Sequence, residues 1–241
     1  MGSGPVPAGG AELTCRADAE GALWCPSPNF GPRRGGLKPS LIVLHYTAME
    51  GAEAALQRLC DPASEVSAHY LIAADGRIWQ LVAEAERAWH AGAGEWQGQD
   101  DINSRSIGIE LDNRGNHPFS AVQMDRLEAL MRGIMDRWQI PAAGVIGHSC
   151  MAPGRKSDPG PRFDWARLAR QGLAAPSSVG GAAPTSADMT AFRAAARAAG
   201  FTAPVQDEAL LQAVRLRFRP SGKGALAAED FAALPGASGV A

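Results

Sequence analysis

The chain has 241 residues, of which 46% are hydrophobic and 20% charged, a composition typical of a folded globular protein rather than a disordered or fibrous one. Its 23 basic and 25 acidic residues nearly cancel and leave a formal net charge of -2. Without a strongly basic field, nucleic acid and anionic membranes are not the expected partners. No apolar run approaches the roughly 20 residues that cross a bilayer, so we expect no membrane span.

The N-terminal stretch and the cysteines bear on the compartment. Residues 1–10 lack the basic cluster and apolar run of a secretory signal, so a cytoplasmic location is expected, with the periplasm as the alternative if this is the trimmed start of an exported protein. The four cysteines, Cys15, Cys25, Cys60 and Cys150, permit disulfides without establishing them. A bridge between Cys15 and Cys25 is the alternative for an exported protein.

Composition divides the chain into four parts. Residues 1–37 are rich in Gly, Pro and Ala without periodicity, and we expect an extended leader that wraps the core. Residues 38–173 contain most of the periodic segments and are expected to form the main domain. Residues 174–186 have the composition of a linker, and residues 187–241 are expected to form a small helical module. So small a module is near the lower limit for independent folding and is expected to lean on the main domain.

The main domain alternates between strand and helix signals. Asp75-Gly76 is a strong signal for a two-residue hairpin turn, and Ser120 is placed to cap the helix that follows it. The predicted strands are 41–44, 70–73, 78–82, 106–111 and 145–147, and the predicted helices are 51–59, 120–138 and one that begins at Asp164. This mixed order predicts an α/β fold.

Two apolar faces at helical spacing follow the linker. One runs from Phe192 to Ala199 and is closed by Gly200, and the other runs from Leu210 to Phe218. A third helix is predicted within residues 227–234. The module should therefore be a small helical bundle.

Three residues that suit a metal ion stand where strand ends and a loop can meet. His45 follows the strand 41–44, His148 follows the strand 145–147, and Asp158 lies in a Pro- and Gly-bounded loop ten residues later. Catalytic zinc sites use three such protein ligands and leave the fourth position open. Spacing alone leaves an alternative, in which the two histidines hydrogen-bond within the core and Asp158 begins a turn.

Four short motifs follow one another along the main domain. They are Leu44-His45-Tyr46-Thr47, residues 66–72, residues 106–110, and Gly147-His148-Ser149 followed by residues 152–160. With them the chain resembles the N-acetylmuramoyl-L-alanine amidase family, in the branch that includes the anhydro-muropeptide amidases. The resemblance covers roughly residues 27–172 and implies a mixed central β-sheet flanked by helices around a zinc cleft.

The resemblance also assigns roles to residues. It implies that His45, His148 and Asp158 hold Zn²⁺, and that Glu110 and Lys156 are catalytic. Chemistry gives Glu110 the role of proton acceptor and later donor, and Lys156 that of stabilising the oxyanion. Taken singly, Glu110 has the alternative of a structural salt bridge and Lys156 that of a solvated loop charge.

Further residues of the matched segments are candidates for substrate contact: His90, in the segment 88–92, together with Tyr46 and Arg155. Cys150 departs from related sequences, which often carry an acidic residue there. We expect a small buried residue, with a metal ligand or a partner of Cys60 as alternatives. The C-terminal helices resemble the peptidoglycan-binding module of some family members, and the alternative is a bundle that only stabilises the core.

The predicted function is hydrolysis of the amide bond between N-acetylmuramic or anhydromuramic acid and L-alanine in peptidoglycan or muropeptides. The alternative is a recognition module that binds peptidoglycan in the same cleft without cutting it. A missing ligand or a missing Glu110 would favour recognition, and neither is missing. We expect a monomer.

Overall fold

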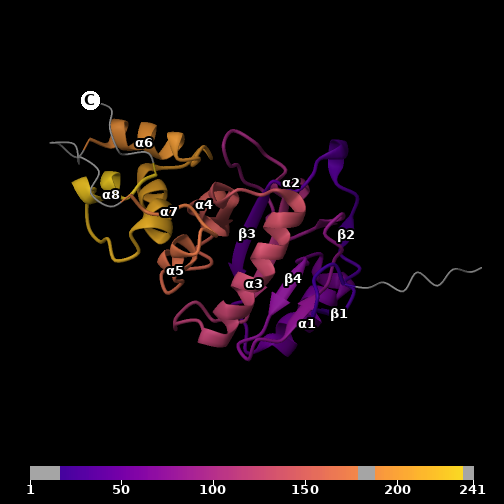
Figure 1. Cartoon of the computed structure of the whole chain (residues 1–241). Helices are drawn as coiled ribbons and strands as arrows, with labels where there is room; N and C mark the ends of the chain where they lie inside the picture. Colours follow the sequence, from indigo (N-terminus) through magenta and orange to yellow (C-terminus); the bar gives the residue numbers. More distant parts are fainter. Residues whose placement is uncertain (1–16, 179–187, 236–241) are drawn as a thin grey trace, which may run out of the picture.

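The computed structural model describes residues 17–178 and 188–235 and has a mixed β-sheet at its centre (Figure 1). The strands are β1 (Leu23–Trp24), β2 (Phe30–Gly31), β3 (Leu41–Tyr46), β4 (Tyr70–Ile72), β5 (Ile78–Gln80), β6 (Arg87–Ala88), β7 (Ser106–Leu111) and β8 (Val145–Gly147). Six of them form a sheet in the order β1-β5-β4-β7-β3-β8, in which only the β4–β5 pair is antiparallel. The remaining two, β2 and β6, form a small antiparallel pair.

Helices surround this sheet. They are α1 (Ala52–Cys60), α2 (Ile102–Arg105), α3 (Ala121–Trp138), α4 (His148–Met151), α5 (Trp165–Arg170), α6 (Met189–Ala198), α7 (Asp207–Phe218) and α8 (Ala228–Ala232). Short 3-10 helices occupy Arg34–Gly36, Pro62–Ser64 and Ala142–Gly144. No helix in the described ranges is long and apolar enough to cross a membrane. The α/β fold expected from the sequence is confirmed.

One face of the sheet is apolar and is covered by α3 and α5. Successive side chains of a strand point to opposite faces, so Ile42 and Leu44 of β3 and Ile107 and Ile109 of β7 share this face. Leu127 of α3 packs into the same cluster and is fully buried. Period-two burial therefore leaves His45 and Glu110 on the other face.

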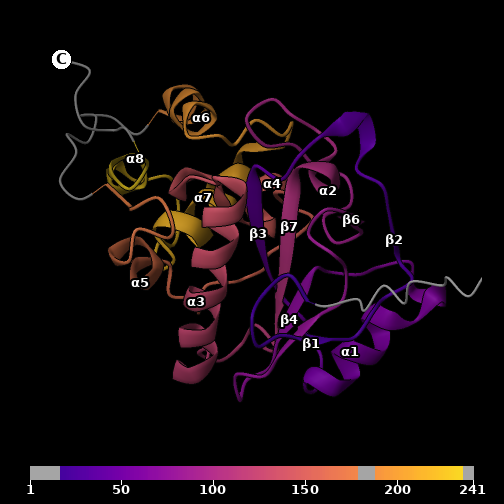
Figure 2. The ribbon, with the colours of Figure 1, turned by 45° about the vertical axis from the view of Figure 1, so that its right-hand side comes forward.

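That other face is flanked on two sides. Toward β4 and β5, Ala55 and Leu59 of α1 pack with Leu71 and Trp79. Toward β8, α4 and the C-terminal helices pack against the sheet in a second cluster. Figure 2 shows α1 and the C-terminal helices α6–α8 on opposite sides of the molecule. The face between them is open, and the candidate site lies there.

The C-terminal helices share a core with the main domain. Phe192 of α6 and Val214 of α7 belong to the same buried cluster as Val43 of β3 and Ile146 of β8. Arg217 of α7 is buried, lies 4.1 Å over the ring of Trp165 and donates a hydrogen bond to the Ala175 carbonyl. The C-terminal helices thus pack against the main domain, as expected. The domain boundary in the predicted linker stays a prediction, because residues 179–187 lie outside the described ranges.

The hairpin, the cap of α3 and the N-terminal segment differ in detail from what the sequence predicts. The hairpin at Asp75-Gly76 is confirmed, but its loop has three residues rather than two, because the Ala73 amide donates to the Arg77 carbonyl and Gly76 takes φ 89°. Ser120 caps α3 by accepting a hydrogen bond from the Gln123 amide. Gln123 itself does not complete a capping box, because its side chain donates to the Ile72 and Asp112 carbonyls. The described part of the predicted leader does more than wrap the core, since β1 adds a parallel edge strand to the sheet.

Candidate active site

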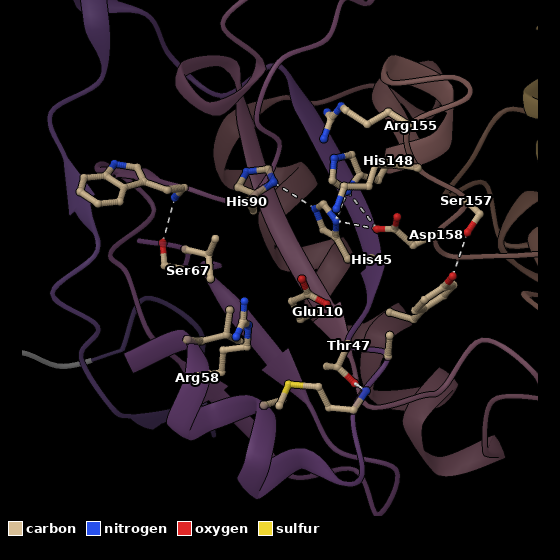
Figure 3. A pocket seen from close by; sticks show the side chains of 18 residues that line it. His45, Thr47, Arg58, Ser67, His90, Glu110, His148, Arg155, Ser157 and Asp158 are labelled. Carbon is tan, nitrogen blue, oxygen red and sulfur yellow. Dashed lines mark hydrogen bonds and ion pairs between the residues drawn. The ribbon is translucent and has the colours of Figure 1, made fainter. Parts of the chain in front are cut away.

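Three side chains converge at the open face, as the sequence predicts. His45 Nδ1 lies 2.9 Å from His148 Nδ1 and 2.9 Å from Asp158 Oδ2, and His148 Nδ1 lies 3.0 Å from the same oxygen (Figure 3). All three residues are buried. Donor atoms that each lie about 2.0–2.2 Å from one tetrahedral cation are about 3.3–3.6 Å apart, so a small outward shift of these side chains would let the set hold a zinc ion.

The local structure explains how Asp158 reaches the two histidines. His45 is near the end of β3, and His148 begins α4 directly after β8, the neighbouring parallel strand. The loop carrying Asp158 folds back onto the start of α4, where the Ser149 amide donates to the Asp158 carbonyl at 3.0 Å. A Cβ at Gly147 would lie 2.7 Å from Pro159 Cδ. Glycine at 147 therefore lets the third ligand approach.

Hydrogen bonds at the second ring nitrogens select which nitrogen faces the metal position. His148 Nε2 lies 2.8 Å from the Ala91 carbonyl, to which it donates, so Nδ1 keeps its lone pair. His45 is oriented by a longer chain. Its Nε2 lies 3.0 Å from His90 Nδ1, and His90 Nε2 lies 3.1 Å from the Ser106 hydroxyl.

Ser106 determines which atom donates in each of these hydrogen bonds. Its hydroxyl donates to the Ile102 carbonyl at 2.6 Å and therefore accepts from His90 Nε2. Burial, and then the neighbouring His45 ring, lower the pKa of His90 well below its usual value, so the His90 ring is neutral and its Nδ1 accepts from His45 Nε2. The His45 Nδ1 lone pair is then directed at the metal position.

His90 has a structural role that the sequence does not reveal. Its two ring nitrogens bond to His45 and Ser106 and its side chain is buried, but the residue also lines the cleft, so contact of His90 with substrate stays a prediction. Ser106 was not singled out at all. One signal was available, because a glycine inside a strand often marks a close approach. A Cβ at Gly108 would lie 2.4 Å from the His90 ring.

Electrostatics keep His45 and Asp158 in the forms that bind metal. Burial, and then the neighbouring His148, lower the pKa of His45 to about 4, which leaves it neutral at pH 7. Burial would raise the pKa of Asp158, but its contacts with His148 and His45 outweigh burial and hold this pKa below its ordinary value. Neutral imidazole and ionised carboxylate are the ligand forms that zinc requires.

Glu110 lies beside this cluster on the neighbouring strand β7, in register with His45 of β3. Figure 3 shows its carboxyl group just below the His45 ring, in the cleft. Burial, and then the Asp158 charge, raise the pKa of Glu110 to about 8, although Lys156 lowers it. Its Oε2 is buried and makes no hydrogen bond with any described residue. A carboxyl group of this kind can exchange a proton near neutral pH.

The cluster and Glu110 lie in a cleft of about 400 Å³. Lys156 lines it from the loop before Asp158, as predicted, and so do Tyr46 and Arg155. The Tyr46 and Ser157 hydroxyls are 2.8 Å apart, and the Arg155 guanidinium donates to the Ala91 carbonyl at 2.8 Å.

The opposite wall holds a residue that the sequence analysis did not single out. Arg58 of α1 reaches into the cleft below Glu110 (Figure 3). Within the described ranges no carboxylate pairs with its guanidinium. No local pattern marks Arg58, because its place follows only from how α1 packs on the sheet.

Cys150 is small and buried, as expected. It packs with Ile146 and Val214 between the sheet and the C-terminal helices, and it is not part of the metal cluster. Cys60 packs with the separate cluster around Leu71, and both thiols are free. The structure therefore supports neither alternative role for Cys150. The Cys15–Cys25 bridge stays a prediction, because Cys15 lies outside the described ranges.

Comparison with known proteins decides the family. The sequence model of the N-acetylmuramoyl-L-alanine amidases matches residues 35–161, which is more than half of the chain and includes all five predicted metal-binding and catalytic residues. The chain belongs to this family. The resemblance and the enzyme class predicted from the motifs are thereby confirmed.

Two curated members of the family are similar to this chain over more than half of its length. The amidase AmiD of Escherichia coli is 42% identical over 151 residues, which cover 56% of this chain and 54% of AmiD, so the alignment spans about half of that relative. The 1,6-anhydro-N-acetylmuramyl-L-alanine amidase AmpD of Escherichia coli is 37% identical over 165 residues, which cover 61% of this chain and 90% of AmpD.

Solved structures extend the match beyond the main domain. Escherichia coli AmiD, in complex with the substrate anhydro-N-acetylmuramic acid-L-Ala-D-gamma-Glu-L-Lys, matches with a TM-score of 0.73 and 34% identity over 90% of each chain. AmpDh3 of Pseudomonas aeruginosa matches with a TM-score of 0.73 and 32% identity, over 87% of this chain and 92% of that one. Coverage this high extends well beyond residues 35–161 and reaches into the segment of the C-terminal helices.

Proposed function

We propose that this protein is a zinc-dependent amidase that cuts the bond between the lactyl group of muramic or anhydromuramic acid and L-alanine. The observation that carries the proposal is the convergence of His45, His148 and Asp158 within 3.0 Å of one another, beside the carboxyl group of Glu110. Family membership supplies the reaction class. The fixed orientation of both imidazoles supports zinc as the cofactor.

Zinc bound by these residues supplies a Lewis acid that polarises the amide carbonyl and makes a water molecule more acidic. Glu110 accepts the proton of the attacking water through its unpartnered Oε2 and then delivers it to the departing L-alanine amine. The raised pKa of Glu110 suits both steps, because the group is neither too weak a base nor too weak an acid near neutral pH.

Lys156 stabilises the negative charge that develops on the carbonyl oxygen. Its ammonium group is close enough to Glu110 and His45 to lower the pKa of both, and it lines the same cleft. A positive charge already in place at that oxygen costs no reorganisation during the reaction. Arg155 holds the wall of the cleft in shape through the Ala91 carbonyl and offers its remaining N–H groups to substrate.

The other end of the cleft suits the stem peptide. AmiD was solved with a muramyl peptide that contains a D-gamma-Glu residue, whose α-carboxylate is free. We assign recognition of such a carboxylate to Arg58, because it reaches into the cleft and pairs with no described carboxylate. Tyr46 and His90 also line the cleft, with the Tyr46 hydroxyl bonded to Ser157 and the His90 ring bonded to His45.

The likeness to AmpD and AmiD favours a soluble anhydro-muropeptide as substrate, with the intact wall as the second choice. Recognition without hydrolysis is disfavoured, because the metal cluster and Glu110 are both in place. Binding of cell wall by the C-terminal helices and a monomeric state stay predictions.

The test is hydrolysis by zinc-loaded protein. Anhydro-N-acetylmuramyl tripeptide and purified sacculi are incubated separately with the protein, and the free peptide is measured by liquid chromatography and mass spectrometry. We expect release of a peptide that begins with L-alanine, loss of release with a chelator, and recovery when zinc is added. Binding of both substrates without any release, in an assay where a control amidase is active, would contradict hydrolysis and favour recognition.

A further inference from the structure

Two cysteines far apart in the sequence are neighbours at the edge of the sheet. Cys25 follows β1, where its amide donates to the Gln80 carbonyl of β5, and Cys60 is the last residue of α1. Cys60 Sγ lies 3.8 Å from the Cys25 carbonyl oxygen. Both side chains are half-buried and pack against the cluster around Leu71 and Trp79.

Side-chain hydrogen bonds hold these two segments together on their own. The Ser27 hydroxyl donates to the Leu59 carbonyl at 2.5 Å. The Asn29 amide group donates to the Asp61 and Val66 carbonyls, each at 2.8 Å. These hydrogen bonds connect the segment after β1 to the end of α1 on both sides of Cys60. The two cysteines therefore lie close together without a covalent bond between them.

The chemistry of the pair favours a lasting bond over a reactive thiol. Burial, and then the neighbouring Cys25 thiol, raise the pKa of Cys60 to about 11. A thiol of such high pKa is almost entirely protonated at pH 7 and attacks disulfides slowly, so Cys60 is poorly suited to rapid redox sensing. The remaining described cysteine, Cys150, is enclosed in a different cluster and cannot compete.

We propose that Cys25 and Cys60 form a structural disulfide when the protein meets a disulfide donor. A Cys thiolate attacks the donor disulfide and forms a mixed disulfide, the second Cys thiolate displaces the donor, and a Cys25–Cys60 bond forms. The two cysteines lose two protons and two electrons, and the donor is reduced to two thiols. The donor is a small-molecule disulfide or the disulfide form of an oxidoreductase.

The bond would tie β1 to the helix that forms one wall of the cleft. Ala55, Arg58 and Leu59 of α1 line that cleft. Linking positions 25 and 60 restricts the unfolded chain and stabilises the folded one. Disulfides of this kind persist in oxidising compartments, so the bond is expected only in protein that has left a reducing cytoplasm.

The test uses the full chain and does not depend on hydrolysis. Protein is treated with oxidised glutathione or with dithiothreitol, alkylated under denaturing conditions, digested and mapped by mass spectrometry, with thermal unfolding measured in parallel. We expect a Cys25–Cys60 cross-linked peptide in the oxidised sample and a Tm about 5–10 °C above that of the reduced sample. Cys60→Ser should abolish both the peptide and the Tm difference, whereas Cys150→Ser should keep both.

Each alternative outcome overturns the proposal. Full alkylation of Cys25 and Cys60 after oxidation of folded protein would mean that the thiols do not pair. A Cys15–Cys25 peptide in place of the Cys25–Cys60 peptide would assign the bond to a different partner. Persistence of the Tm difference in Cys60→Ser protein would show that its source is elsewhere. Because the reduced form of each variant is its own reference, a general loss of stability does not obscure the result.

Discussion

The two faces of the sheet differ in how strictly the fold and the site constrain their residues. The face covered by α3 is mostly apolar, with the polar groups of Gln123 and Tyr70 as exceptions, and its apolar residues serve chiefly to fill space. The opposite face carries His45 and Glu110 on the same strands, and there each polar atom needs one particular partner. One face of β3 and β7 therefore packs the core, and the other face carries the residues of the candidate active site. Substitutions on the two faces should separate stability from catalysis.

The largest effect is expected at a metal ligand. Asp158→Ala removes the only carboxylate of the described metal cluster and should abolish stoichiometric zinc binding. Activity should fall more than 10³-fold, beyond the roughly 10–100-fold loss typical of an outer-shell partner. Metal content measured by mass spectrometry and peptide release measured in parallel test this prediction. Full zinc occupancy with unchanged activity would remove Asp158 from the site.

The next effect separates catalysis from metal binding. Glu110→Gln keeps the shape of the side chain but cannot accept the proton, so kcat should fall about 10²–10⁴-fold while zinc content stays the same. Because the pKa of Glu110 is raised, activity of the parent protein should rise with pH as this carboxyl group loses its proton. A bound cation shifts that rise to lower pH. Parental turnover by Glu110→Gln would show that another group is the base.

The apolar face should respond in the opposite sense. Leu127→Ala leaves a cavity in the fully buried cluster under α3 and should lower the free energy of unfolding by about 2–5 kcal/mol. Activity per folded molecule should not change. Val122→Ala on the same helix is the matched control, because Val122 is 43% exposed and should cost far less. Denaturant unfolding measures both, and equal losses would contradict the packing of α3.

A smaller effect is expected from the chain of hydrogen bonds behind His45. Ser106→Ala removes the acceptor of His90 and should weaken zinc binding about 10–100-fold without removing a ligand. Ser67→Ala is the matched control, because Ser67 lines the same cleft but bonds to Asn29 and Trp89 instead. Competition with a chromogenic chelator measures both affinities. Equal zinc affinity of Ser106→Ala and the parent would show that the hydrogen bond from His90 to Ser106 does not support the metal site.

The smallest effect concerns a buried carboxylate that has no part in catalysis. Burial raises the pKa of Glu84, but hydrogen bonds from Arg137, Tyr70 and Trp138 outweigh burial and hold it below its usual value. Its stabilising effect is therefore present above the unfolded-state pKa and is lost as pH falls through the folded-state pKa.

Glu84→Gln should cost about 1–3 kcal/mol of unfolding free energy at pH 7. The difference from the parent should shrink in acid, and activity of the folded protein should be kept. Unfolding curves at pH 7 and near pH 3 measure it. A difference that grows in acid would contradict the assignment.

Local patterns predicted the scaffold and the placement of the site. Period-two alternation in Ser106–Leu111 is enough to place Glu110 on the face opposite Ile109, and apolar runs ending at His45 and His148 locate two metal ligands. These signals are local because a strand fixes its side-chain directions over a few residues. The family motifs then assigned the chemistry.

Contacts between distant segments were not predictable in this way. The Ser106–His90–His45 chain, the entry of Arg58 into the cleft and the meeting of Cys25 with Cys60 all depend on how separate elements pack. No periodicity records such packing, since each partner lies 16 to 45 positions away or is brought in by a whole helix. The motif around His90 places it in the cleft, but only the packing of β3 and β7 shows that its ring also bonds to His45 and Ser106.

The most direct test is a crystal structure of zinc-loaded protein with anomalous scattering measured on both sides of the zinc absorption edge. We expect one strong zinc peak within bonding distance of His45 Nδ1, His148 Nδ1 and Asp158 Oδ2, with the Glu110 carboxyl group facing it across the cleft. A peak at other residues, or ligation through the Nε2 atoms with the Ser106–His90–His45 chain broken, would contradict this expectation.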